Sequence, residues 1–187
     1  AIGIDIEGPV AIVTGAGSGI GAACATALAA RGCRVVVNYQ HSREGASDTA
    51  AQCQALGVEA VSVQGSVTNN GDCQKILDET MSAFGRLDLL VNNAGVTRFA
   101  HQKDLAALDA ADFENIMSVN VTGSYQMTRA AVPDLEKSDC AAVVNVSSHS
   151  GMSGIGSSMA YAASKGALNT MTLSLARNLA PTIRVNA

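Results

Sequence analysis

Aromatic residues and prolines are scarce in this sequence. Only 3% of its 187 residues are Phe, Trp or Tyr, with no Trp at all, and there are 3 prolines. A sandwich core rich in aromatic side chains is therefore disfavoured, and no Pro-, Gly- or Ser-rich stretch suggests a disordered linker. The 48% of hydrophobic residues and the 18 glycines are typical of helices packed on a parallel sheet. We expect one globular domain over residues 1–187.

A basic surface of the kind that binds nucleic acid is also lacking. The formal net charge is -4, and the 12 Lys and Arg residues are scattered, which argues against nucleic acid or an anionic membrane as a partner. No apolar stretch reaches the roughly 20 residues that span a bilayer. Residues 1–9 carry acids where a signal peptide would carry bases. These features predict a soluble protein.

Paired cysteines and metal-ligand clusters are missing as well. The 5 cysteines form no Cys-x-x-Cys pair and no cluster with His, and an odd number cannot be fully paired within one chain. They predict reduced thiols, a cytoplasmic location and no metal site. The cysteines are Cys24, Cys33, Cys53, Cys73 and Cys140.

Short apolar runs alternate with segments of helical periodicity along the whole chain. This alternation predicts a doubly wound parallel sheet with helices on both faces, hence three layers, and strand order 3-2-1-4-5-6. The chain ends inside the last expected strand without a turn or cap, so we expect a C-terminal edge strand to be missing. Strands are expected at 10–14, 34–39, 58–64, 87–91, 141–146 and 183–187. Helices are expected at 20–31, before 57, at 70–84, from 109 towards 133, and at 158–179.

A glycine-rich turn follows the first expected strand and opens the first helix. It reads Thr-Gly-Ala-Gly-Ser-Gly-Ile-Gly over residues 14–21. Glycines let the backbone approach a pyrophosphate closely, and a helix N-terminus offers N–H donors with a favourable dipole. The strand before and the helix after favour a dinucleotide-binding turn, whereas no Gly-Lys-Ser/Thr follows as in a P-loop.

Four further groups of polar residues carry chemistry and are considered with this turn. Asn-Asn-Ala-Gly at 92–95 ends the fourth strand, which lies beside the first strand at the switch point of such a sheet. Tyr161 and Lys165 lie on one helical face, where the positive charge favours the phenolate form of tyrosine. Ser147 and Ser148 follow the fifth strand, where a hydroxyl can polarise a carbonyl. Asn120 lies in an apolar stretch and is on its own equally consistent with a hydrogen-bonded core residue.

Together these motifs resemble those of the short-chain dehydrogenase/reductase family. Members share a Thr-Gly-x-x-x-Gly-x-Gly turn, an Asn-Asn-Ala-Gly motif and an Asn, Ser, Tyr, Lys tetrad, in this order along a Rossmann-type fold. The resemblance extends from about Val10 to the end of the sequence. The matching residues are Thr14, Gly15, Gly19 and Gly21, then Asn92 to Gly95, then Asn120, Ser148, Tyr161 and Lys165.

The resemblance implies an NAD(P)-dependent oxidoreductase acting on a small carbonyl or secondary alcohol substrate. It implies that Tyr161 transfers the proton, that Lys165 assists Tyr161 and holds the nicotinamide ribose, that Ser148 binds the substrate oxygen and that Asn120 holds a relay water. A departure is Ser66, where members usually carry an Asp that binds adenine. The expected cofactor-binding residues are Gly15, Ser18, Gly19, Ile20, Gly21, Asn38, Arg43, Ser66, Val67, Asn93, Ala94, Gly95, Tyr161 and Lys165.

The end of the second expected strand predicts which dinucleotide is bound. An acid there binds the ribose 2′-hydroxyl of NAD, but the run from Asn38 to Arg43 contains no acid. A guanidinium can bind and neutralise the 2′-phosphate of NADP, so NADP(H) is favoured over NAD(H). The alternative that Arg43 only begins a solvated helix remains open.

Two further expectations concern assembly and class. Apolar residues lie on both sides of the late helices, as at Met171, Leu173 and Leu175, which suggests a partner surface. With the family resemblance this predicts a homodimer or homotetramer. The alternative function is a non-catalytic NAD(P)-binding sensor or scaffold, against which the complete Ser148, Tyr161 and Lys165 set argues.

Overall fold

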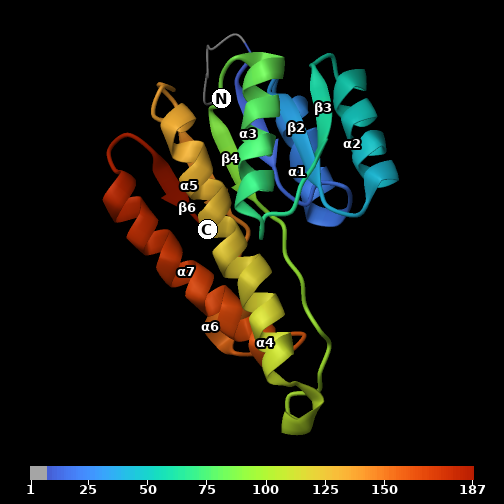
Figure 1. Cartoon of the computed structure of the whole chain (residues 1–187), viewed down its shortest axis with the longest axis vertical. Coiled ribbons are helices and arrows are strands. Elements are labelled where there is room, and N and C mark those ends of the chain that lie inside the picture. The colour runs from blue at the N-terminus through green and yellow to red at the C-terminus, as the bar shows by residue number, and fades with distance from the viewer. Residues whose placement is uncertain (1–7) are drawn as a thin grey trace.

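The structure is a computed structural model that describes residues 8–187. The N-terminal segment on which the signal-peptide expectation rests lies mostly outside the described residues. Six parallel strands form one sheet in the order β3-β2-β1-β4-β5-β6, which confirms the predicted topology (Figure 1). The strands are β1 (Val10–Val13), β2 (Arg34–Tyr39), β3 (Ala60–Gln64), β4 (Leu89–Asn92), β5 (Ala142–Asn145) and β6 (Arg184–Asn186).

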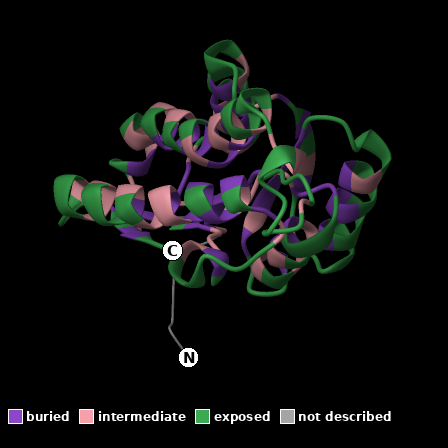
Figure 2. Ribbon diagram, turned by 90° about the horizontal axis from the view of Figure 1, so that it is seen from below, coloured by how far each residue is buried: buried purple, intermediate pink, exposed green. Residues whose placement is uncertain are grey.

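The helices cover the two faces of the sheet as separate groups. One core cluster joins the strands to α3, α5 and the later part of α7, and a second joins them to α1 and α2. Figure 2 shows buried residues along the faces that the helices turn to the sheet. The helices are α1 (Gly19–Ala29), α2 (Arg43–Ala55), α3 (Asn70–Phe84), α4 (Ala110–Met117), α5 (Ser124–Leu135), α6 (Ser150–Ser153) and α7 (Met159–Leu179).

The long helix expected from residue 109 is present as two α-helices, α4 and α5, joined without a gap by a π-helical segment. Asp109 caps α4 as predicted, with its carboxylate accepting from Asp112 N. A π-helical segment, Ser118–Gly123, then joins α4 to α5. Pro133 lies inside α5, and the helix continues to Leu135, because proline at this point removes one hydrogen bond but is close to the helix end.

Other differences from the predicted elements are small and local. The strand expected from residue 58 begins at Ala60. The four-residue helix α6 and a short 3₁₀ turn, Leu105–Ala107, were not predicted, because such short elements show no periodicity. In the described part of the chain, no helix combines the length and apolar character needed to cross a membrane. Within residues 8–187 no group of three or more His, Cys, Asp or Glu could hold a metal ion.

Candidate active site

The glycine-rich turn between β1 and α1 is held close to the end of β4. Gly15 has φ of +63°, and a Cβ built on it would lie 2.9 Å from Ala94 Cα. A Cβ on Gly21 would lie 2.6 Å from Gly15 O, so a side chain at either position would push the turn open. The first turn of α1 contains no acidic residue, and the Ser18 side chain makes no capping bond. The backbone therefore forms an electropositive cradle that suits a pyrophosphate.

Asn93 and Thr14 fasten this turn to the end of β4. Asn93 Nδ2 donates to Thr14 O at 2.9 Å and to Gly15 O at 3.1 Å. Thr14 Oγ1 accepts from the backbone N–H groups of Asn93 and Ala94, both at 3.0 Å. Because these bonds join the two strand ends at the switch point, they fix the floor on which a bound dinucleotide would lie.

A cavity of about 440 Å³ opens over this floor. Nine of the fourteen expected cofactor-binding residues line it, whereas Gly21, Arg43, Ser66, Tyr161 and Lys165 do not. The lining residues that the sequence predicted are Gly15, Ser18, Gly19, Ile20, Asn38, Val67, Asn93, Ala94 and Gly95. Those that it did not single out are Gly17, Tyr39, Gln40, His41, Ser42, Gly65, Val96 and Val119. Gln40, His41 and Ser42 belong to the run from Asn38 to Arg43 that the sequence indicated as the place where the dinucleotide is selected, although they were not among the expected cofactor-binding residues.

Three of the expected cofactor contacts are engaged with the protein itself. Asn38 is 1% exposed, and its Nδ2 donates to Val63 O and Gly65 O at 3.2 and 3.1 Å. The Arg43 guanidinium donates to Gln64 Oε1 at 3.4 Å on the surface. Ser66 Oγ hydrogen-bonds the Thr68 hydroxyl. Asn38 therefore ties the ends of β2 and β3 together and does not reach towards the cavity with a free amide.

Lys165 is placed by the first turns of α7. The side chain of Ser158 caps this helix by accepting from Tyr161 N. Lys165 follows one turn later, is 4% exposed, and donates from Nζ to Val146 O at 2.7 Å. Its Nζ lies 5.6 Å from the centre of the Tyr161 ring. Burial lowers the pKa of the Lys165 ammonium, since a low-dielectric environment disfavours the charged form.

Asn120 connects the loop after β4 to α7. Its Oδ1 accepts from Val96 N at 2.8 Å, and its Nδ2 donates to Val96 O at 3.0 Å and to Ser164 Oγ at 3.0 Å. Asn120 lies in the π-helical segment and is 1% exposed. It thus holds the segment beside Gly95 against the helix that carries Tyr161 and Lys165.

Tyr161 and Lys165 line a second cavity of about 420 Å³. This cavity shares Ile20, Asn93, Gly95 and Val96 with the first, so the two adjoin. Ser147 lines the second cavity, and its hydroxyl donates to Asn169 Oδ1 at 2.6 Å.

Ser148 lines a neighbouring cavity of about 830 Å³ on the side of β5, β6 and α7. Its hydroxyl donates to Ser150 Oγ and accepts from Ser150 N, both at 3.1 Å. The structure therefore brings Tyr161, Lys165 and Ser147 together directly, with Ser148 beside them. Contact with a substrate oxygen requires the Ser148 hydroxyl to turn away from Ser150.

Comparison with known proteins shows the family of this chain. The short chain dehydrogenase family profile matches residues 9–187. A protein of Streptomyces violaceoruber named as ketoacyl reductase 2 of the granaticin polyketide synthase is 44% identical, over 97% of this chain and 71% of its own length. Versicolorin reductase 1 of Aspergillus parasiticus is 37% identical, over 91% of this chain and 64% of its own length. This chain therefore spans about two thirds of the length of such relatives.

Solved structures give the same result. A Burkholderia xenovorans protein named as a short-chain dehydrogenase/reductase superposes with a TM-score of 0.94 at 46% identity, covering 97% of this chain and 76% of that one. NAD⁺-bound xylitol dehydrogenase superposes with a TM-score of 0.90 at 34% identity, covering 97% and 69%. The chain belongs to the short-chain dehydrogenase family of NAD(P)-dependent oxidoreductases, which act on CH–OH and C=O groups.

Proposed function

We propose that this protein transfers a hydride between NADP(H) and a small carbonyl or secondary alcohol compound, with Tyr161 as the proton donor or acceptor. One observation carries the proposal: Tyr161 and Lys165 line a cavity that adjoins the glycine-turn cavity and shares four lining residues with it. The turn fits a dinucleotide because Gly15 and Gly21 let it pack closely against the end of β4 and the start of α1, where a Cβ at either position would clash. A bound nicotinamide supplies or accepts the hydride.

The residues of the chain then transfer the proton, stabilise the phenolate and bind the substrate oxygen. The Tyr161 hydroxyl gives its proton to the substrate oxygen in reduction and takes it back in oxidation. The Lys165 ammonium stabilises the phenolate that forms, and within residues 8–187 no carboxylate pairs with it to neutralise its charge. Ser148 donates a hydrogen bond to the substrate oxygen. Asn120 positions the Val96 segment against α7, since both of its amide atoms are engaged there.

NADP(H) is the cofactor that we propose over NAD(H). The support is chemical: the cavity beyond β2 is lined by Gln40, His41 and Ser42, none of which carries the negative charge that would repel a 2′-phosphate. Hydroxyl and imidazole N–H groups can donate to phosphate, and Arg43 adds a positive charge one residue further on. The proposed assembly is a homodimer or homotetramer of single-domain chains. The free cysteines fit a proposed cytoplasmic location.

Turnover of NADPH with a panel of ketones and aldehydes tests the reaction. The wild-type protein should oxidise NADPH with at least one of these substrates, and Tyr161→Phe should lower kcat at least about 100-fold because general acid catalysis is lost. Binding of NADPH should stay nearly unchanged. Tyr125→Phe, which alters an exposed tyrosine outside both cavities, is the matched control and should retain full activity.

Two outcomes would contradict the proposal. Wild-type kcat in the Tyr161→Phe variant would remove Tyr161 from the mechanism. Tight binding of NADPH without turnover of any carbonyl would favour the alternative of a redox sensor or scaffold.

A further inference from the structure

One large aromatic side chain stands exposed at the rim of the Tyr161 cavity. Phe99 is 85% exposed, the largest value among the large hydrophobic residues described, yet it lines the same 420 Å³ cavity as Tyr161 and Lys165. Exposing a phenyl ring to water is unfavourable, and contact with another apolar group relieves this cost. No described residue covers this ring, so its position suits contact with a molecule that enters the cavity.

The segment that carries Phe99 is hydrogen-bonded to the residues directly before α7. Thr97 Oγ1 and Ser157 Oγ share a short hydrogen bond, and Ala100 N donates to Ser157 O at 2.9 Å. Gln102 Nε2 donates to Gly154 O at 3.1 Å. These bonds hold the backbone on both sides of Phe99 against residues 154–157, directly before α7. The backbone that carries Phe99 is therefore held next to the start of α7.

The charge around this cavity restricts what can enter it. Lys165 is its only charged lining residue, and the ammonium is buried and bound to Val146 O. Arg98, next to Phe99 in the chain, is paired with Asp112 at 2.8 Å. No lining guanidinium or ammonium is left to bind a carboxylate or phosphate of the substrate. Desolvating such a group without a partner would be costly.

We propose that Phe99 selects the substrate, and that the carbonyl compound is uncharged near the reacting carbon and carries a flat aromatic ring that stacks on the phenyl group of Phe99. This inference rests on the proposed function and names its substrate class. Stacked or edge-to-face rings gain more than their buried area provides. An aromatic ketone is therefore preferred over a saturated one of the same shape.

A matched pair of ketones tests the aromatic part. 1-Tetralone and 1-decalone share one fused bicyclic skeleton, but only 1-tetralone has an aromatic ring. The wild-type protein should show a higher kcat/KM for 1-tetralone. Phe99→Leu keeps an apolar side chain without a ring, and should lower the preference for 1-tetralone by about two- to tenfold. Phe99→Ala should lower kcat/KM for both ketones.

The control variant is Leu105→Ala, which removes an exposed apolar side chain from the same loop outside this cavity and should leave both values unchanged. A tetralone that bears a ring carboxylate tests the charge requirement and should be a poor substrate. An unchanged preference in Phe99→Leu and Phe99→Ala would overturn the role of Phe99. Equal turnover of the carboxylated ketone would overturn the requirement for an uncharged substrate.

Calorimetric titration of 1-tetralone into the NADP⁺-saturated protein separates this inference from the proposed reaction. Weaker binding to Phe99→Ala than to the wild type supports the role of Phe99 even where no ketone is turned over, a result that would count against the reaction alone. Equal affinity of the two proteins, or no measurable binding to either, would overturn the inference.

Discussion

Lys165 shows how much of the site depends on the surroundings of one residue. A buried ammonium is costly, and burial lowers its pKa. The single carbonyl of Val146, at 2.7 Å, compensates for only part of its lost hydration. A lysine in this state stabilises a phenolate at Tyr161 more strongly than an exposed lysine would.

The preference for NADPH over NADH is also expected to depend on a single residue, Arg43. Arg43→Ala should weaken NADPH binding by about two- to fivefold, as expected for one exposed charge beside a phosphate, and leave NADH binding unchanged. The loss should shrink as salt is raised, because exposed charges are screened. Steady-state KM values for both cofactors at two salt concentrations measure this. Arg31→Ala removes an exposed arginine at the end of α1 and serves as control.

A kcat/KM for NADH equal to or above that for NADPH in the wild type would reject the NADP(H) assignment. An Arg43→Ala effect of equal size on both cofactors would instead show that Arg43 acts on the shared part of the dinucleotide.

Some residues that line the two cavities could be predicted from the sequence, because their position at a strand end or on a helix face does not depend on how the strands pair. The glycines, Asn93, Tyr161 and Lys165 were found because each stands at a strand end or on one helix face. Arg43 and Asn38 were harder to place, because their hydrogen bonds to Gln64, Val63 and Gly65 depend on how β2 and β3 pair. Asn169 had a signal that was not used, since it lies four residues after Lys165 on the same face of α7.

At the scale of elements, α7 is fastened to the end of β5 by three successive hydrogen bonds. Lys165 Nζ bonds Val146 O at 2.7 Å, Asn169 Oδ1 accepts from Ser147 at 2.6 Å, and Thr172 Oγ1 accepts from Asn145 Nδ2 at 2.9 Å. The helix positions are four and three residues apart, which is one face of a helix. These three hydrogen bonds fix the position of α7, and therefore of Tyr161 and Lys165, relative to the end of β5.

Asn169→Ala should therefore affect both catalysis and stability. Loss of this hydrogen bond should lower the free energy of unfolding by about 1 kcal/mol and lower kcat severalfold, with little change in KM for NADPH. Asn169→Asp keeps an acceptor oxygen for Ser147 and should restore most of kcat. Asn178→Ala, which removes an exposed amide bonded within the same helix to Ser174 O, should change neither quantity. A loss of stability without loss of kcat would show that these hydrogen bonds are only structural.

Elements were predicted best where periodicity is long. The order of strands and the helices α1, α3 and α7 followed from the sequence, because each spans several turns or a continuous apolar run. The π-helical segment did not, since its distortion accompanies the hydrogen bonds of Asn120 to Val96 and Ser164, which are distant in sequence. Such bulges arise from tertiary contacts at functional sites.

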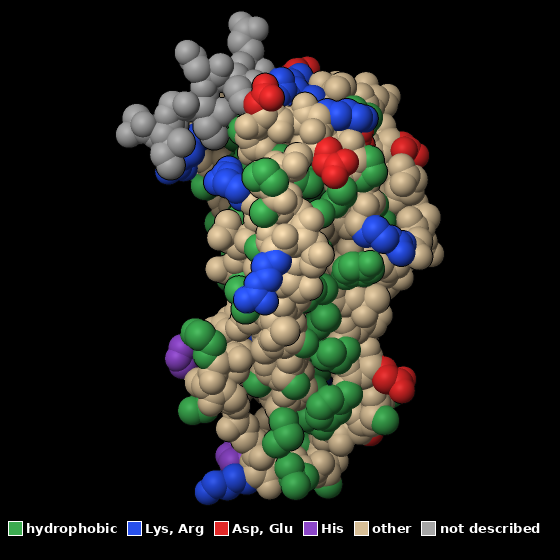
Figure 3. All heavy atoms as spheres, turned by 90° about the vertical axis from the view of Figure 1, so that its left-hand side faces the viewer, with side chains coloured by type: hydrophobic (Ala, Val, Ile, Leu, Met, Phe, Trp, Pro, Cys, Tyr) green, Lys and Arg blue, Asp and Glu red, His purple; other side chains and the backbone are tan. Residues whose placement is uncertain are grey.

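For the whole molecule, the side that carries α7 is a candidate interface between copies of the chain. Hydrophobic side chains gather over the lower half of this face in Figure 3, with few charged groups among them. Leu173 on α7 is 60% exposed, whereas Leu175 packs against the core. Light scattering should give a dimer or tetramer at micromolar concentration. Leu173→Lys should weaken the assembly, whereas Leu56→Lys, at the exposed residue that directly follows α2, should not. A monomeric wild type would reject the interface.

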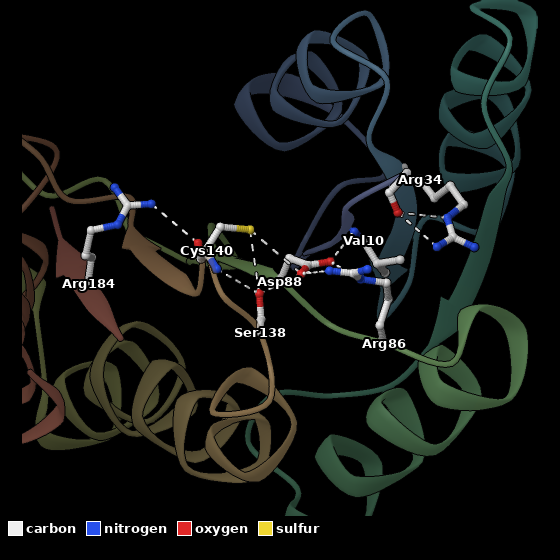
Figure 4. A network of polar contacts seen from close by, with 8 residues as sticks. Val10, Arg34, Arg86, Asp88, Ser138, Cys140 and Arg184 are labelled. Atoms are coloured by element: carbon white, nitrogen blue, oxygen red, sulfur yellow. Dashed lines mark hydrogen bonds and ion pairs between the residues drawn. The ribbon is translucent and has the colours of Figure 1, made fainter. Parts of the chain in front are cut away.

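The end of the sheet opposite the site is closed by Asp88, and this sets an acid limit on the whole fold. Asp88 is fully buried and accepts from Val10 N at 2.8 Å, from Ser138 Oγ at 2.6 Å and from the Arg86 guanidinium at 2.7 and 2.9 Å. Figure 4 shows these groups converging from three segments of the chain. Burial alone would raise the pKa of Asp88, but the hydrogen bonds from Arg86, Ser138 and Val10 outweigh it and hold the pKa below its ordinary value.

A carboxylate with a lowered pKa in the folded state stabilises the fold above its unfolded pKa of about 3.9 and loses that contribution as pH falls further. Asp88→Asn should therefore lower the free energy of unfolding by about 2 kcal/mol at pH 7, and the gap to the wild type should narrow at pH values below about 4. Urea unfolding of the wild type and the variant at pH 7 and at a pH below about 4 measures this difference in the free energy of unfolding. The control is Asp134→Asn, which removes a surface ion pair with Lys137 and should have a small effect at either pH. Affinity for NADPH should not change, because Asp88 directly precedes β4 whereas the cofactor cavity is lined by Asn93 and Ala94 after its other end. A gap of equal size at both pH values would show that Asp88 contributes through packing and not through its charge.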